Sequence, residues 1–253
     1  MIERMGVRIE HDSELGRNID LADLKKRFDA IFLGLGLGAT QVMGIPGEEL
    51  ILDGLEYIEQ SKLNPGALTI GCNVVVIGAG NTAIDCATVA KRLGADEVTM
   101  IYRRSEQEMS AYPHEYDFVK KEGVGVRFLT QPVRVLAERG RVTGLVCVRM
   151  ELGTVDGSGR RIPQPVHDSE FVIATDQVVK AVGQQKLGLA KTLGLDVDRD
   201  FIRVNADLET SLPGVFAGGD CIRAKGAAST VMAVQDGKLA AAAIHSRLGK
   251  KNG

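Results

Sequence analysis

The chain has 253 residues, of which 44% are hydrophobic, and its 31 basic and 33 acidic side chains give a formal net charge of −2. This length suits one large or two modest domains with a sizeable buried core. The near-neutral charge and the low aromatic content, four Tyr and seven Phe, provide neither the basic surface nor the stacking platforms of a nucleic-acid-binding protein. We therefore exclude that class.

The sequence shows no membrane segment, secretion signal or metal motif. The opening residues are charged, unlike a signal peptide, and the longest apolar stretch, residues 30–39, falls well short of the ~20 residues of a membrane span. The four cysteines contain no CxxC pair and the four histidines no ligand spacing. We expect a cytoplasmic protein with free thiols, no metal site and no membrane partner.

The first elements in chain order are a strand, a helix and a second strand. Residues Val7–Glu10 predict a short strand, and Leu21–Arg27 a helix for which Asp20 is a suitable N-cap. The run Ala30–Leu35 is apolar without alternation, which is typical of a strand buried on both faces in a parallel sheet.

The run ends in glycines at positions 34, 36 and 38, whose spacing resembles a dinucleotide-binding fingerprint. A true fingerprint opens a helix, but two glycines and Pro46 within residues 40–49 prevent one. We interpret the segment as a crossover in which Gly36 lets the backbone pass close to a cofactor. A helix is expected to resume over Leu50–Gln60.

The clearest signal is a strand, a glycine turn, a helix and a second strand. Asn73–Ile77 is β-branched, helical spacing runs to Leu93, and Glu97–Tyr102 is again β-branched. Gly78 permits a tight turn, and Gly80 lets the backbone approach a pyrophosphate, which the amides of the helix N-terminus bind. The predicted dinucleotide-binding residues are Gly78, Ala79, Gly80, Asn81 and Thr82; the alternative is a glycine pair that serves packing alone.

The end of the second strand indicates which dinucleotide is bound. An NAD site places a carboxylate there to hold the ribose hydroxyls, whereas this strand ends in Arg103 and Arg104. Two guanidiniums suit bidentate contact with a phosphate. We therefore expect NADPH; the alternative is a solvated basic pair.

The rest of the chain predicts a helix, an antiparallel meander and a return to α/β structure. Gly183 follows the last strand of the meander region and is also assigned to the cofactor site. The expected helices are Pro113–Glu122 and Ser229–Leu248, and the expected strands are Val126–Leu129, Val133–Glu138, Val142–Leu152, Phe171–Ala174, Gln177–Val182, Ile202–Val204 and Gly214–Ala217.

A second ligand loop is predicted after the last of these strands. Gly219 and Asp220 place a carboxylate at the end of a buried strand, ahead of a loop and a long helix. Such a carboxylate would suit a polyol chain with a polar ring system at the helix N-terminus. A structural turn is the alternative that the residues leave open.

Four stretches of the sequence are informative together: NVVVIGAGNTAIDCA, the YRR that ends the next strand, LPGVFAGGDC and AVQDGKLAA. They resemble the flavoprotein small subunit of glutamate synthase and are similar also to the flavin subunit of bacterial dihydropyrimidine dehydrogenase. The resemblance covers essentially the whole chain. It implies an α/β fold of two Rossmann-like domains with a β-meander, in which an NAD(P)H domain (residues 71–183) is inserted into an incomplete FAD domain (residues 1–70 and 184–253).

The resemblance also implies roles for individual residues. The turn at Gly78–Thr82 would contact the NADPH pyrophosphate, and Arg103 and Arg104 its 2′-phosphate. Asp220 would contact the ribityl chain of FAD, and the amides of residues 228–231, including Ser229, Thr230 and Val231, would approach the flavin ring. No side-chain acid or base is required for hydride transfer, so no catalytic residue is assigned.

Family members begin with a cysteine region that binds iron–sulfur clusters and with a unit that holds the ADP half of FAD, and this sequence matches neither. We expect the chain to correspond to the C-terminal portion of the family and to hold FAD weakly. The strands at 30–35 and 214–217 would then lack neighbours, which a missing N-terminal region, a redox partner subunit or a homo-oligomer would supply.

These observations predict a flavoprotein oxidoreductase module that passes hydride from NADPH to FAD and electrons to a partner subunit. A nucleotide-binding or assembly module without redox chemistry is the alternative. A short-chain dehydrogenase would need a Tyr-x-x-x-Lys pair, for which Tyr116 and Lys120 are the candidate, but no Ser partner is positioned by the sequence.

Overall fold

The computed structural model describes residues 2–155, 157, 159–186, 188–223 and 229–249, and the chain divides into two compact units. Ala39–Gln184 form the central unit; the residues up to Gly38 and from Gln185 onward form the terminal unit. The first division between the units thus falls at residue 38, where the sequence predicted a domain boundary at residue 70. The reason is that the short strand at 52–53 joins the sheet of the central unit.

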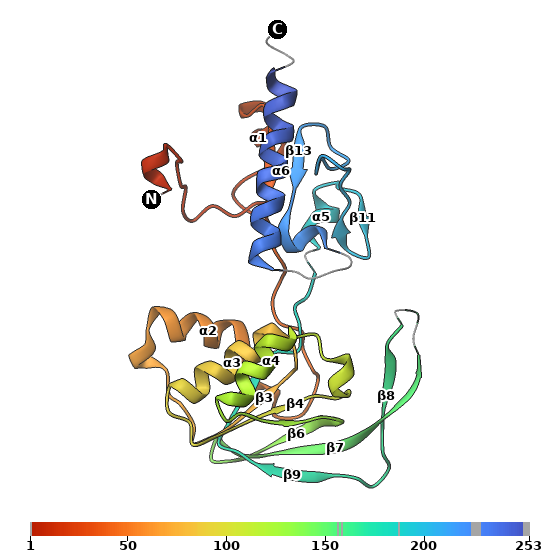
Figure 1. Ribbon diagram of the computed structural model, residues 1–253. Coiled ribbons are helices and arrows are strands. Elements are labelled where there is room, and N and C mark those ends of the chain that lie inside the picture. Colours follow the sequence, from red (N-terminus) through yellow and green to blue (C-terminus); the bar gives the residue numbers. More distant parts are fainter. Residues whose placement is uncertain (1, 156, 158, 187, 224–228, 250–253) are drawn as a thin grey trace. The chain divides into compact units, whose positions relative to one another are not determined.

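A five-stranded parallel sheet in the order β2-β10-β3-β4-β5 organises the central unit. Its helices lie on one face of this sheet (Figure 1). The strand bounds are Leu52–Asp53 for β2, Asn73–Ile77 for β3, Glu97–Ile101 for β4, Gly125–Arg127 for β5 and Gln177–Lys180 for β10, and the helices are α2 (Gly54–Leu63), α3 (Asn81–Arg92) and α4 (Pro113–Lys121).

The antiparallel meander lies on the other face of the sheet (Figure 1). Strand β7 pairs with β6, β8 and β9, all antiparallel. Val74 and Val76 of β3 belong to the core cluster under α2 and α3, whereas Val75 and Ile77 belong to the cluster beneath the meander. Alternate residues of β3 are therefore buried on both faces. The strand bounds are Thr130–Glu138 for β6, Arg141–Val155 for β7, Arg161–Pro165 for β8 and Phe171–Ala174 for β9.

The terminal unit is built on a two-stranded parallel sheet, β1 with β13. In the described part of the chain no third strand joins it, and Phe32 of β1 is 40% exposed. The helices and strands of the terminal unit are α1 (Leu21–Arg27), β1 (Ile31–Leu33), α5 (Leu189–Thr192), β11 (Val197–Asp198), β12 (Phe201–Ile202), β13 (Val215–Ala217) and α6 (Thr230–Gly249). This unit also has two short 3-10 helices, η1 (Glu3–Met5) and, after β13, η5 (Gly219–Ile222). The 3-10 helices η2 (Glu48–Leu50), η3 (Pro65–Ala67) and η4 (Glu106–Glu108) belong to the central unit.

Three local expectations were wrong. Residues 7–10 form no strand and are exposed. The helix expected over Leu50–Gln60 begins at Gly54, because Asp53 accepts hydrogen bonds from the amides of residues 55 and 56 and caps it there. Strand β8 was not foreseen. Among the described residues, no helix is long and apolar enough to cross a membrane.

Candidate nucleotide-binding site

A cavity of about 450 Å³ lies at the carboxyl ends of β3, β4 and β10 in the central unit. The carboxyl edge of a parallel sheet is where open α/β folds bind their ligands, and this volume is within the usual range for small-molecule sites. Seven residues expected at a cofactor border this one cavity: Gly78, Ala79, Gly80, Thr82, Arg103, Arg104 and Gly183.

The glycine turn has the geometry that its sequence predicted. Gly78 has a φ of 138°, and a Cβ added to it would overlap the carbonyl oxygen of Ala181 on the neighbouring strand. Gly80 is the N-cap of α3 and has no side chain to cover the first amides of that helix. The turn therefore brings the backbone and the positive end of α3 to the cavity.

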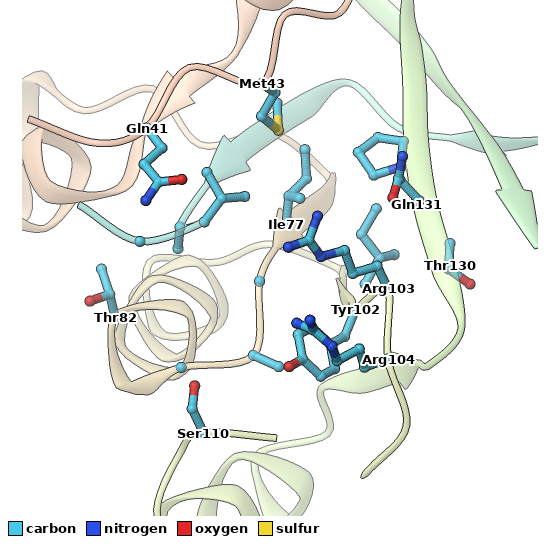
Figure 2. Close-up of a pocket in the computed structure, with 18 of the residues that line it drawn as sticks. Gln41, Met43, Ile77, Thr82, Tyr102, Arg103, Arg104, Ser110, Thr130 and Gln131 are labelled. Carbon is cyan, nitrogen blue, oxygen red and sulfur yellow. The ribbon is translucent and has the colours of Figure 1, made fainter. Parts of the chain in front are cut away.

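The two arginines at the end of β4 face the same space. Figure 2 shows the guanidiniums of Arg103 and Arg104 pointing toward the centre of the cavity, which Thr82 and Gln41 border on the other side. The Nε of Arg104 donates a 3.0 Å hydrogen bond to the carbonyl oxygen of Arg161. Because Arg161 is the first residue of β8, this bond fixes the orientation of the Arg104 guanidinium relative to that strand.

Sequence reasoning missed a third guanidinium. Arg160, which directly precedes β8, also borders the cavity, and it donates hydrogen bonds to the Tyr102 hydroxyl (2.9 Å) and to the carbonyl oxygen of Glu108 (3.2 Å). The residues that border the cavity, all within the described chain, include three arginines and no carboxylate. The site is therefore built for an anion.

The opposite wall, residues 41–45, is fixed by a partly buried ion pair. The Glu48 carboxylate accepts hydrogen bonds from the amides of Met43 (3.0 Å) and Gly44 (2.7 Å) and from Lys180 Nζ (2.7 Å). Burial acts to raise the pKa of Glu48, but these hydrogen bonds outweigh it and lower that pKa to about 2. The backbone amide of Gln41 donates a hydrogen bond to the carbonyl oxygen of Gly183 (2.9 Å) and holds this residue in place.

One residue of the predicted fingerprint does not line the cavity. The side-chain oxygen of Asn81 accepts a hydrogen bond from the Tyr112 amide (3.3 Å) and so joins α3 to the loop before α4. The Tyr116 and Lys120 pair does not line it either: Lys120 forms an ion pair with Asp117, at 2.9 Å, and lies over the Tyr116 ring. No group of metal ligands occurs among the described residues.

The residues expected at FAD all lie in the terminal unit. Gly36 borders a cavity of about 10 Å³ there, room for about one water molecule. Gly219 and Asp220 are in η5, and Ser229, Thr230 and Val231 stand at the start of α6. Residue 228 is outside the described residues.

The two parts of this second loop are tied together. Asp236 of α6 is buried and accepts a 2.8 Å hydrogen bond from the Gly219 amide, and it forms an ion pair with Arg223. Asp236 therefore holds the turn at Gly219 and Asp220 against α6. At the start of that helix the Ser229 hydroxyl accepts a hydrogen bond from the Met232 amide (3.2 Å). Val231 is 76% exposed.

Comparison with known proteins agrees with this architecture. Residues 2–237 match the family model described as pyridine nucleotide-disulphide oxidoreductase. The chain belongs to this family. The NADPH-Fe(3+) oxidoreductase subunit beta of Geobacter sulfurreducens is 41% identical in an alignment 251 positions long, which covers 87% of this chain and 37% of that protein. The glutamate synthase [NADPH] small chain of Halomonas elongata is 36% identical, over 96% of this chain and 55% of that protein.

The expected relationship to glutamate synthase small chains is thus confirmed, and the chain spans about half or less of the length of these curated relatives. Among solved structures, Mycobacterium tuberculosis FprA in complex with NADPH matches with a TM-score of 0.70 and 19% identity, covering 92% of this chain and 67% of FprA. This likeness confirms the two-Rossmann α/β fold with its antiparallel meander.

Proposed function

We propose that this chain is the NADPH-binding module of a flavoprotein oxidoreductase, with NADPH held in the cavity of the central unit. The observation that carries the proposal is the convergence of a glycine turn, the N-terminus of α3 and three guanidiniums on one cavity, whose described lining residues include no carboxylate. The coenzymes named for the relatives, NADPH in glutamate synthase and in the iron(III) oxidoreductase, support the same choice.

Each part of the cavity suits one part of the coenzyme. The turn at Gly78 and Gly80 and the first amides of α3 suit the pyrophosphate. Arg103 and Arg104 suit the 2′-phosphate. Held there, NADPH would supply a hydride for FAD, and the flavin would supply electrons for a redox partner subunit.

The residues proposed for FAD are Gly36, Gly219, Asp220 and the start of α6. The carboxylate of Asp220 and the N-terminus of α6 offer an acceptor and donors for the polyol and the ring of a flavin. Because the ADP-binding unit of FAD has no counterpart in this sequence, we expect the chain to bind FAD weakly by itself. A homo-oligomer, a redox partner or an N-terminal region is proposed to complete the flavin site.

A titration with both nicotinamide coenzymes tests the proposal. The double substitution R103A/R104A is expected to raise the Kd for NADPH at least about tenfold, because a hydrogen bond to a charged group contributes about 1.5–3 kcal/mol. The Kd for NADH should change little. The double variant R139A/R141A, at the β6–β7 turn, removes the same charge away from the cavity and is the control.

Equal losses for NADPH and NADH would contradict the assignment of the 2′-phosphate, and no binding of either coenzyme to the unsubstituted chain would overturn the proposed function. Addition of FAD distinguishes the proposed oxidoreductase module from an assembly module without redox chemistry. A chain that acquires flavin absorbance, which NADPH then bleaches, is an oxidoreductase module. A chain that binds NADPH but acquires no flavin even together with the segment or subunit proposed to complete the flavin site is not.

A further inference from the structure

We infer that residues 41–45 form the subsite for the nicotinamide ring of NADPH and that Glu48 is the positioning residue that holds them there. This inference rests on the proposed function and deepens it. Strands β4 and β10 flank β3 on opposite sides, and the strand order reverses between β3 and β10. A dinucleotide lies across such a crevice. With the 2′-phosphate at the end of β4, the nicotinamide half therefore falls at the end of β10. The residues that border the cavity there are Gln41, Val42, Met43 and Ile45.

The side chains of this segment suit a nicotinamide ring and its carboxamide. Figure 2 shows Gln41 and Met43 reaching toward the cavity from the side away from the arginines. Met43 and Ile45 offer apolar surface to a flat ring. The side-chain amide of Gln41 has an acceptor oxygen and an NH2 donor group, which complement the donor and the acceptor of a carboxamide. Its Nε2 also donates a 3.4 Å hydrogen bond to the carbonyl oxygen of Gln184, which directs the side chain to the end of β10.

The backbone of residues 41–45 is held by groups outside the segment. All five residues are described, and they belong to no helix or strand. The Gly183 carbonyl oxygen accepts a hydrogen bond from the Gln41 amide (2.9 Å). The Glu48 carboxylate accepts from the next two amides that matter here, those of residues 43 (3.0 Å) and 44 (2.7 Å). Glu48 does not border the cavity itself, so it acts on the coenzyme through the residues that it holds.

A carboxylate is required at position 48 because hydrogen-bond donors reach it from two sides. Its Oε1 accepts from Lys180 Nζ (2.7 Å), and its Oε2 accepts from the Gly44 amide (2.7 Å). The Met43 amide lies 3.0 Å from both oxygens. Glutamine offers one acceptor oxygen and places an NH2 group in the other position, where it meets a donor. Alanine offers no acceptor. E48Q and E48A therefore weaken the support of the segment in two steps, and neither changes a residue that lines the cavity.

The test compares the whole coenzyme with its adenosine fragment in the full chain. E48A is expected to raise the Kd for NADPH and for NADH alike by about fivefold to tenfold, because both lose contacts to the nicotinamide. The Kd for 2′,5′-ADP, which lacks the nicotinamide, should change less than about twofold. E48Q should fall between E48A and the unsubstituted chain. E49Q, at the exposed neighbouring position, is the control and should bind all three ligands as the unsubstituted chain does.

Q41A provides a second test, which does not depend on how well the Glu48 variants fold. The Gln41 side chain is exposed and borders the cavity, so its removal leaves the ion pair of Glu48 and Lys180 in place. We expect the same pattern as in E48A. The Kd for NADPH and for NADH should rise about fivefold, the effect of one hydrogen bond between neutral groups, and the Kd for 2′,5′-ADP should stay the same.

The outcomes separate this inference from the proposed function. If the unsubstituted chain binds neither NADPH nor 2′,5′-ADP, the proposed function fails and the inference with it. If Q41A binds NADPH as tightly as the unsubstituted chain, the inference alone fails. Equal losses of NADPH and 2′,5′-ADP in E48A would also overturn it, because they would mean that Glu48 supports the fold of the central unit and not a nicotinamide subsite.

Discussion

Gly78 shows, at the scale of one residue, why the turn after β3 requires a glycine. Its φ of 138° is a conformation that other residues rarely adopt, and a Cβ there would overlap the carbonyl oxygen of Ala181. The Gly78 amide also donates to the Ile101 carbonyl oxygen (3.0 Å). The turn therefore sits between two neighbouring strands, and the chain cannot bulge there without loosening the cavity.

We expect G78A to lower the free energy of unfolding of the central unit by roughly 2–5 kcal/mol, the sum of the backbone strain and an overpacking cost. G94A is the matched control: Gly94 has a φ of 107°, but nothing lies within 4 Å of an added Cβ. It should cost only the strain, about 1–2 kcal/mol. Urea unfolding of both variants measures the difference, and equal costs would show that the Ala181 contact is unimportant.

The arginines illustrate what the sequence could and could not predict about the site. Arg103 and Arg104 were predicted because they follow the second strand of a recognisable strand–turn–helix–strand unit. Within such a unit, the residues that form the site are close to one another in the sequence. Arg160 could not be predicted, because the register of β7 with β8 brings it to the cavity. The same holds for Glu48, whose partner Lys180 lies at the far end of the unit's sequence.

At the scale of elements, the predictions succeeded where burial and sequence pattern agree. Strand β3 has four consecutive buried residues after Asn73, and α3 repeats small apolar residues at helical spacing. Strand β8 escaped prediction because its sequence, RIPQP, contains two prolines and pairs with β7 alone. The strand predicted at residues 7–10 does not form, because a sequence that favours β structure becomes a strand only where a partner strand pairs with it.

The ion pair between η2 and β10 gives a prediction at this scale. E48Q is expected to lower the free energy of unfolding of the central unit by about 1–3 kcal/mol at neutral pH, because the largely covered Lys180 loses its counter-charge. The side chains of Glu48 and Lys180 are only 13% and 14% exposed. E49Q, at the neighbouring exposed position, is the control and should change stability by no more than about 0.5 kcal/mol.

The pH dependence of unfolding provides a second measurement on the same variant. The pKa of Glu48 is about 2 in the folded chain against an ordinary value of 4.5. Its stabilising effect is therefore complete above pH 4.5 and is lost as the pH falls toward 2. E48Q lacks this component, so its stability should fall less steeply than that of the unsubstituted chain over this range. If the free energy of unfolding of the two proteins fell equally steeply between pH 4.5 and 2, the lowered pKa of Glu48 would be contradicted.

At the scale of the whole molecule, the two units differ in how completely the described residues build a site. The central unit encloses its cavity with residues 41–183 alone. The terminal unit has the two-stranded sheet of β1 and β13, with Phe32 of that sheet and Val234 of α6 exposed. NADPH binding is thus expected to need only the central unit.

Hydrogen exchange on the full chain tests this independence. At a hundredfold excess over its Kd, NADPH should stabilise the unit that binds it by about 2.7 kcal/mol. We expect the added protection in peptides from residues 39–184, most strongly around Gly78–Thr82 and Arg103–Arg104, and no change in peptides of the terminal unit. R103A/R104A, with its Kd raised at least about tenfold, should reduce this stabilisation to about 1.4 kcal/mol or less at the same NADPH concentration. Protection that spreads equally over both units would mean that they respond to the coenzyme as one body.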